Sequence, residues 1–206
     1  MKTEVLSADS PDALPDALEV LKRGGVVAFP TDTVYGIGAM VFDAEAVARL
    51  YAAKGRPPEK AIPILVGQTE DVSKVAARVT PSAKKLAEAF WPGALTLVLP
   101  KLSTVPEIVS TYPTIGVRLP NHAVARALLM LTGPLAVTSA NLSGMNSHLH
   151  ARAVLADLKG RIDLLIDGGP CPGGVPSTVL DCTIEPPEIL RAGPISAEAI
   201  VAVLEE

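Results

Sequence analysis

The sequence predicts a single α/β domain over residues 1–206, with a mixed β-sheet flanked by helices. Short apolar runs rich in β-branched residues alternate with segments of helical periodicity along the whole chain, as is typical of α/β proteins. No Ser/Gly-rich linker or charge block divides the chain, so a second domain is not expected. The turn between the strands expected at 26–29 and 35–41 is too short for a crossover helix, which favours a mixed sheet over a purely parallel one.

The first helix is expected over residues 11–22, because Leu14, Leu18 and Leu21 recur at helical spacing before two glycines. The continuous apolar run at 26–29 predicts a buried strand, and a turn then leads to a second strand at 35–41. Asp43 is expected to cap the next helix. Gly55 and the two prolines after it are expected to end that helix near Lys54.

The remaining elements are assigned by the same two periodicities. Strands are expected at 62–66, 94–99, 115–119, 135–138, 164–167, 178–181 and 188–191. Helices are expected at 72–78, 82–90, 121–131, 151–159 and 196–204.

Composition indicates a core-rich globular protein of the cytoplasm. Hydrophobic residues make up 49% of the chain and charged residues 19%, unlike the composition of disordered chains. The net charge is -4 and only 3% of residues are aromatic, so neither a broad basic field nor many stacking rings would bind nucleic acid. The sequence lacks a signal peptide pattern and a bilayer-length apolar run, and its two cysteines favour a reducing compartment.

Two segments carry the strongest chemical signal. Lys54 and Arg56 flank Gly55 in a proline-stiffened loop and could direct two cations toward one anion. Ser139 and Asn141 follow an apolar strand at its carboxyl end, where α/β sheets bind ligands. Each segment also has a plainer interpretation, as a solvated basic loop in the first case and as a turn with capping side chains in the second.

Two further strand ends place hydroxyl groups beside glycines, and they contain Thr33 and Ser177. Arg118 alternates with apolar residues, so its side chain is expected on the opposite face of its strand, and Arg191 ends another strand. Both arginines could equally be surface cations. The three histidines lack partners at zinc-ligand spacing, and no P-loop, dinucleotide-binding glycine motif or nucleophile elbow occurs.

Between residues 24 and 193 the chain contains ordered blocks that read GGVVAFPTDTVYGIG, KGRPPEKAIPILV, WPGALTLVLP, TIGVRLP, TSANLSG, DGG, PSTVLD and ILRAG. Through these blocks the chain resembles the YrdC/TsaC family. The KxR and SxN signatures of the family match Lys54 with Arg56 and Ser139 with Asn141. The resemblance implies an open twisted mixed sheet flanked by helices around a large, positively lined cavity.

The resemblance also implies an activity, that of an L-threonylcarbamoyladenylate synthase, a nucleotidyltransferase of tRNA modification. L-threonine would capture bicarbonate or CO₂, and the N-carboxy group would attack the α-phosphate of ATP and expel pyrophosphate. Mg²⁺ would accompany ATP, held mainly by the phosphates and not by a protein metal site. The implied catalytic residues are Lys54 and Arg56. The implied ATP ligands are Lys54, Arg56, Thr114, Ser139, Asn141 and Arg191, and the implied L-threonine ligands are Thr33, Arg118 and Ser177.

The sequence departs from many family members in having no histidine in residues 62–67. Its length corresponds to the short form of the family, which is expected to pass its product to a separate threonylcarbamoyl transferase complex, with weak or no direct tRNA binding and no membrane association. Two alternatives stay open: an RNA-binding or ribosome-maturation protein, and an enzyme that forms a carbamoyl adenylate from carbamoyl phosphate.

Overall fold

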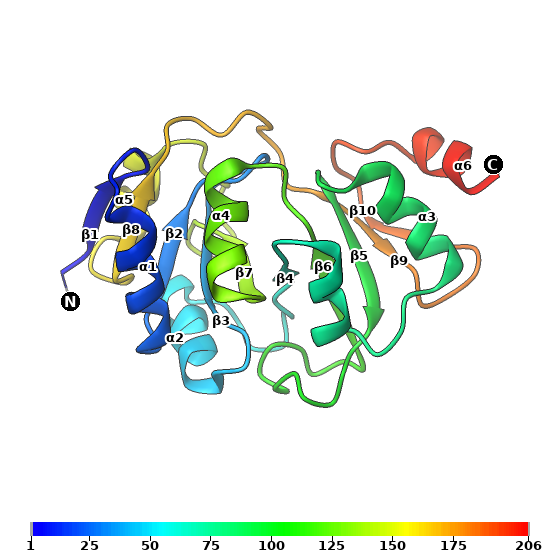
Figure 1. Cartoon of the computed structure of the whole chain (residues 1–206), viewed down its shortest axis with the longest axis horizontal. Helices are drawn as coiled ribbons and strands as arrows, with labels where there is room; N and C mark the ends of the chain where they lie inside the picture. The colour runs from blue at the N-terminus through cyan, green and yellow to red at the C-terminus, as the bar shows by residue number, and fades with distance from the viewer. Residues whose placement is uncertain (1, 206) are drawn as a thin grey trace.

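The computed structural model describes residues 2–205. Within them, ten strands form one sheet in the order β1-β8-β2-β3-β7-β4-β6-β5-β9-β10 (Figure 1). Parallel pairs such as β1–β8 and β5–β9 lie beside antiparallel pairs such as β2–β3 and β5–β6, which confirms the expected mixed sheet. The strands are β1 (Glu4–Ser7), β2 (Val27–Phe29), β3 (Gly36–Met40), β4 (Ile64–Leu65), β5 (Leu95–Pro100), β6 (Thr114–Arg118), β7 (Leu135–Ser139), β8 (Leu164–Asp167), β9 (Thr178–Asp181) and β10 (Glu188–Arg191).

Helices cover both faces of the sheet. They are α1 (Ala13–Lys22), α2 (Ala44–Lys54), α3 (Pro81–Phe90), α4 (Ala123–Thr132), α5 (Ala151–Leu158) and α6 (Ala197–Glu205), with a 3₁₀ helix η1 at Thr69–Lys74. Helices α1 and α4 lie side by side over one face (Figure 1) and share a hydrophobic cluster with β2, β7 and β8. The other four helices bury their apolar residues in a second, larger cluster. Because α1 and α4 cover only part of their face, the strands beyond them are left open on that side.

The sequence signals at both ends of α2 form as expected. The Asp43 carboxylate accepts hydrogen bonds from the backbone N–H groups of Glu45 and Ala46, both at 3.0 Å. At the other end, Gly55 has φ +59°, a left-handed conformation that glycine adopts without strain. The helix therefore ends where Lys54 and Arg56 begin their loop, which fixes the position of both cations.

One local prediction was wrong, and one strand was missed. The α-helix expected at 72–78 is replaced by η1, which ends at Lys74. Just after it, the backbone N–H of Ala77 donates to Pro100 O and that of Leu102 donates to Val75 O, so pairing with the end of β5 removes the chain from a helical path. Strand β1 was not expected. It is a short edge strand of mixed polarity that pairs in parallel with β8, a pattern too brief to predict.

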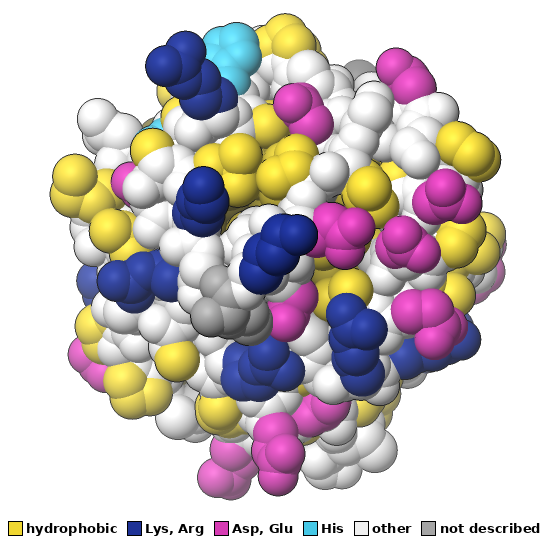
Figure 2. Space-filling view, turned by 90° about the vertical axis from the view of Figure 1, so that its left-hand side faces the viewer, with side chains coloured by type: hydrophobic (Ala, Val, Ile, Leu, Met, Phe, Trp, Pro, Cys, Tyr) yellow, Lys and Arg dark blue, Asp and Glu magenta, His cyan; other side chains and the backbone are white. Residues whose placement is uncertain are grey.

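The face around edge strand β1 carries charges of both signs. Figure 2 shows lysine and arginine side chains interspersed with carboxylates around hydrophobic groups. Mixed charge at a sheet edge limits pairing with other strands and gives no continuous basic surface. None of the helices in the described residues is long and apolar enough to cross a membrane.

The cap of α2 leads to a stability prediction. Asp43→Ala should lower the free energy of unfolding by about 1 kcal/mol, because two backbone N–H groups lose their acceptor. Asp12→Ala is the matched control, since Asp12 holds the same N-cap position on α1 without a side-chain cap hydrogen bond. Urea unfolding of the two variants measures the difference. Equal destabilisation by both would contradict the assigned cap.

Candidate functional site

A cavity of ≈ 340 Å³ opens on the part of the sheet that α1 and α4 leave uncovered. Two-residue alternation along the strands creates it: Leu97 and Val117 point into the hydrophobic core, whereas Thr96, Gly116 and Arg118 line the cavity. The volume is within the usual range for small-ligand sites. One face of the same strands therefore builds the core while the other builds a binding site.

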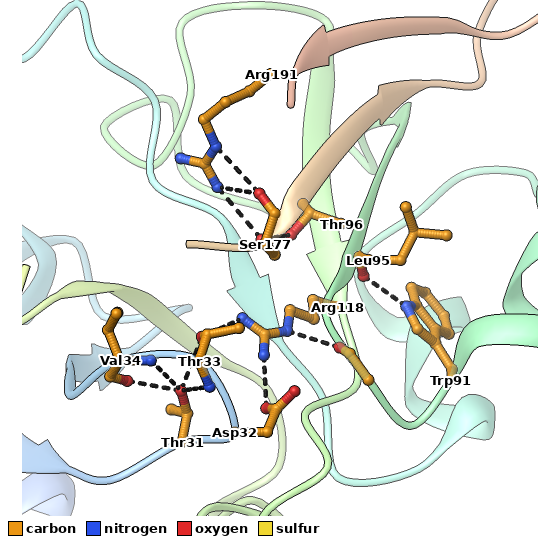
Figure 3. Close-up of polar contacts among 11 residues, drawn as sticks. Thr31, Asp32, Thr33, Val34, Trp91, Leu95, Thr96, Arg118, Ser177 and Arg191 are labelled. Carbon is orange, nitrogen blue, oxygen red and sulfur yellow. Dashed lines mark hydrogen bonds and ion pairs between the residues drawn. The ribbon is translucent and has the colours of Figure 1, made fainter. Parts of the chain in front are cut away.

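Arg118 is the most completely fixed cation of the cavity. Its side chain is 7% exposed, and its Nη2 pairs with Asp32 Oδ1 at 2.5 Å. Nε donates to Gly93 O at 2.8 Å and Nη1 donates to Thr33 Oγ1 at 3.0 Å (Figure 3). Burial lowers the pKa of Arg118 and the Asp32 carboxylate opposes that shift, so the guanidinium is held charged and oriented. Its remaining N–H groups are available to an anion such as a carboxylate.

A second cluster joins β5, β9 and β10. Ser177 Oγ lies 2.8 Å from Thr96 Oγ1 and accepts a hydrogen bond from Arg191 Nη2 at 3.3 Å. Arg191 also donates to the backbone oxygen of Ser177 from Nε and Nη2 (Figure 3). The guanidinium is therefore tied to the strand end that carries the serine hydroxyl.

Three guanidinium groups lie close enough to influence one another. Arg56 donates from Nε to Lys60 O at 3.0 Å and from Nη2 to Ala61 O at 2.8 Å, and it lines the same cavity. Burial, followed by the charge of Arg56, lowers the pKa of Arg191, and the charge of Arg191 acts in the same direction on Arg118. Like charges at partly buried positions favour the binding of an anion, which relieves their repulsion.

Lys54 lies behind this wall of the cavity. Its ammonium donates to the backbone oxygens of Ser139 and of Asn141, the latter at 2.6 Å. The residue is 2% exposed, and burial followed by the charge of Arg56 lowers the pKa of Lys54 to about 7. Lys54 thus holds the Ser139–Asn141 segment in place and carries a proton that small electrostatic changes can shift.

Asn141 has an unusual buried acceptor. Its Nδ2 donates to Leu142 O and to Met145 O, both at 2.7 Å, which fixes the orientation of the amide, because the reverse orientation would point three oxygens at one another. Its Oδ1 is buried without a hydrogen-bond partner among the described residues. An unpaired buried acceptor costs free energy, so this oxygen is suited to a ligand donor or a cation.

The segment at 168–177 crosses from β8 to β9 and closes one side of the cavity. Tyr35 Oη donates to Gly169 O at 2.8 Å, and the N–H of Gly174 donates to Thr33 O at 3.0 Å. At Gly173 an added Cβ would lie 2.5 Å from Asp32 O, so only glycine permits this close approach. The segment therefore packs directly on the turn that presents Thr33.

The structure brings together most of the residues that were expected to bind ATP or L-threonine. Six of them line the cavity, namely Thr33, Arg56, Arg118, Ser139, Ser177 and Arg191. Lys54 and Asn141 lie directly behind Ser139. Thr114 lies on the cavity side of β6 by alternation with Gly116 and Arg118, two and four residues along the strand, but does not line the cavity; its backbone oxygen accepts a hydrogen bond from Ser110.

Sequence reasoning missed Thr31, Asp32 and Thr96. Each of them contacts a residue that was expected to bind a ligand: Thr31 lies 3.0 Å from Thr33, Asp32 pairs with Arg118, and Thr96 contacts Ser177. A signal was present at Thr96, which is a polar residue between Leu95 and Leu97 and follows the same alternation that singled out Arg118.

The fold and the site together define an α/β protein with an arginine-lined cavity of a size suited to small ligands, and the comparisons give its family. The Sua5/YciO/YrdC family model, described as telomere recombination, matches residues 19–193. A threonylcarbamoyl-AMP synthase from Pyrococcus abyssi is 43% identical over 90% of this chain and 55% of its own length. A putative threonylcarbamoyl-AMP synthase from Mycobacterium tuberculosis is 37% identical over 98% of this chain and 95% of its own length. The chain belongs to the Sua5/YciO/YrdC family.

A solved structure supports the same placement. The crystal structure of P. abyssi Sua5 complexed with L-threonine has a TM-score of 0.94 at 39% identity, covering 100% of this chain and 62% of that one. The chain therefore spans a little over half the length of the P. abyssi relatives that it matches.

The lowered pKa of Lys54 gives a pH-dependent stability. The unfolded chain has the ordinary value of 10.5 and the folded chain about 7, so between these values the unfolded state binds more protons and stability rises with pH. The contribution of Lys54 to the free energy of unfolding is therefore complete above pH 10.5 and is lost as the pH falls to about 7. From pH 7.5 to 8.5 the free energy of unfolding of the wild type should gain about 1 kcal/mol relative to Lys54→Met. Urea unfolding at both pH values tests this, and parallel pH profiles would contradict it.

Proposed function

We propose that this chain is an L-threonylcarbamoyladenylate synthase, which converts L-threonine, bicarbonate or CO₂, and ATP to threonylcarbamoyl-AMP and pyrophosphate. The observation that carries the proposal is the convergence of Arg56, Arg118 and Arg191 with the hydroxyls of Thr33, Ser139 and Ser177 on one cavity. Relatives named threonylcarbamoyl-AMP synthase and a relative's complex with L-threonine support it.

The two ends of the cavity suit different ligands. Thr33, Arg118 and Ser177 would hold L-threonine, with Arg118 on its carboxylate. Arg56 and Arg191, with Lys54, Ser139, Asn141 and Thr114, would hold ATP and the bicarbonate-derived group, with Lys54 and Arg56 as the catalytic pair. Negative charge grows on the α-phosphate and pyrophosphate during the reaction, so fixed cations lower the barrier by stabilising charge and by aligning the reactants.

The site fits Mg²⁺ that arrives mainly with ATP. Within residues 2–205 no group of three or more histidine, cysteine or acidic side chains could hold a metal ion, whereas Asn141 Oδ1 is a buried oxygen without a partner. Mg²⁺ prefers oxygen ligands and usually keeps few protein contacts. Asn141 would supply one such oxygen, and the ion would offset phosphate charge.

The wider setting is part of the same proposal. The product would pass to a separate threonylcarbamoyl transferase complex for tRNA modification in the cytoplasm. The net charge of -4 and the mixed charge of the face in Figure 2 support weak or no direct tRNA binding.

The reaction can be tested directly. With Mg²⁺, ATP, bicarbonate and L-threonine, the protein should form threonylcarbamoyl-AMP and pyrophosphate only when all three substrates are present. Mass detection after short incubation is the measurement, with omission of each substrate as the control. Adenylate formation from carbamoyl phosphate, without a threonine-dependent product, would favour the carbamoyl-transfer alternative instead.

The catalytic pair gives a second test. Lys54→Ala and Arg56→Ala should each reduce kcat/KM by about 100-fold or more, because each removes a cation from the charge that develops in the transition state. Lys84→Ala and Arg23→Ala remove the same charges from exposed positions on α3 and after α1 and should retain activity. Activity of Arg56→Ala equal to that of the wild type would refute the assignment.

A further inference from the structure

The turn that presents Thr33 contains a chain of buried hydrogen bonds that runs through Thr31. Thr31 and Thr33 are 3% and 2% exposed, and their hydroxyl oxygens lie 3.0 Å apart. Thr31 Oγ1 is also 2.6 Å from Val34 O and 3.2 Å and 3.3 Å from the backbone nitrogens of Thr33 and Val34. Figure 3 shows Thr33 between Thr31 and the Arg118 guanidinium.

Elementary donor and acceptor rules fix the direction of these bonds. A carbonyl oxygen can only accept, so the single hydroxyl proton of Thr31 is donated to Val34 O. Because the proton of Thr31 is already donated, Thr33 is the donor in the 3.0 Å contact between the two hydroxyl oxygens. The two longer backbone N–H bonds to Thr31 Oγ1, at 3.2 Å and 3.3 Å, then share its other lone pair. The guanidinium can only donate, so Thr33 accepts from Arg118 Nη1. The Thr33 hydroxyl oxygen then has one lone pair left, with which it can accept a hydrogen bond from a ligand.

From this we infer that Thr31 is a positioning residue that fixes the Thr33 hydroxyl as a hydrogen-bond acceptor toward the cavity. The site then selects a ligand that carries an N–H donor next to its carboxylate, which is the arrangement of an α-amino acid. Thr33 Oγ1 and Arg118 Nη1 are joined by a hydrogen bond of 3.0 Å. The two ligand groups that bind these atoms must therefore also lie next to each other in the ligand. The amino and carboxylate groups on one α-carbon meet that requirement.

The acceptor state of Thr33 also suits the chemistry of the proposed function, on which this step rests. The neutral amine nitrogen must attack CO₂ with its lone pair. The C–N bond forms as one C=O π bond of CO₂ breaks to give the carboxylate, and one N–H proton passes to water. A hydroxyl that donated to the amine would occupy that lone pair. A hydroxyl that accepts an N–H orients the amine and leaves the lone pair free.

The experiment compares Thr31→Val, which removes the hydroxyl at nearly constant shape, with Thr31→Ser, which keeps it. Calorimetry measures the binding of L-threonine, ATP, L-2-aminobutyrate and 2-oxobutanoate. The last two share a carbon skeleton, but at Cα the first of them presents an N–H donor and the second a carbonyl acceptor. Thr3→Val is the matched control, because Thr3 Oγ1 likewise donates to a carbonyl, at Ile162, and accepts a backbone N–H, at Gly160, away from the cavity.

In Thr31→Val the Thr33 proton is free to turn into the cavity. L-threonine and L-2-aminobutyrate should bind about tenfold more weakly, 2-oxobutanoate should bind at least as well as to the wild type, and ATP affinity should stay within about twofold. Thr31→Ser should restore the preference for the amino acid, and Thr3→Val should show wild-type binding. An unchanged amino-to-oxo preference in Thr31→Val, or equal losses for all four ligands, would overturn the inference.

Two further measurements keep the inference testable if Thr31→Val does not fold. The wild type should bind L-2-aminobutyrate at least about tenfold more tightly than 2-oxobutanoate, and Thr33→Val should lose this preference because the acceptor is gone. Equal affinity of the wild type for both ligands would refute an acceptor at Thr33. Because these are binding measurements, the inference stands if they succeed while no adenylate is formed, in which case only the proposed function fails.

Discussion

The two-residue alternation of β5, β6 and β9 is the constraint on which both the core and the site depend. Each strand sends apolar side chains into the larger hydrophobic cluster and turns the alternate residues to the opposite face, where Thr96, Val98, Gly116, Arg118 and Val179 line the cavity. A shift of β6 by one residue would turn Arg118 toward the core and Val117 toward the cavity, and the same shift of β5 would expose Leu97 to the cavity. Burial of the leucines therefore holds the binding side chains in register, so that stability and function rest on the same strand pairings.

Much of this arrangement could be predicted from the sequence because the signals were local and periodic. The bounds of β8, β9 and β10 match their expected ranges, and the ends of α2 follow from Asp43 and Gly55. The helix expected at 72–78 was wrong because its backbone groups pair with the end of β5, a contact made by residues distant in sequence. Strand β1 was missed since it depends on β8, more than 150 residues later.

In the site, too, local patterns could be predicted from the sequence and contacts between distant residues could not. Arg118 was singled out by alternation alone, and the cavity confirms that it faces away from the core. By contrast, the ion pair with Asp32, the Thr96–Ser177 contact and the carbonyls that bind the Lys54 ammonium join separate parts of the chain. No spacing rule predicts such contacts, because they depend on how strands far apart in sequence come to lie side by side.

The segment at 168–177 joins the two halves of the sheet and lies on the Thr33 turn. This arrangement means that the cavity is completed late in synthesis of the chain. The cavity needs the turn at 31–34 together with Ser177 and Arg191. A ribosome adds Arg191 roughly 10 to 30 s after that turn at ordinary rates of synthesis. A nascent chain that stops before β10 has no complete cavity, so a ligand that contacts the whole lining could stabilise only chains whose synthesis has passed Arg191. Such a ligand would distinguish chains that contain β10 from chains that do not.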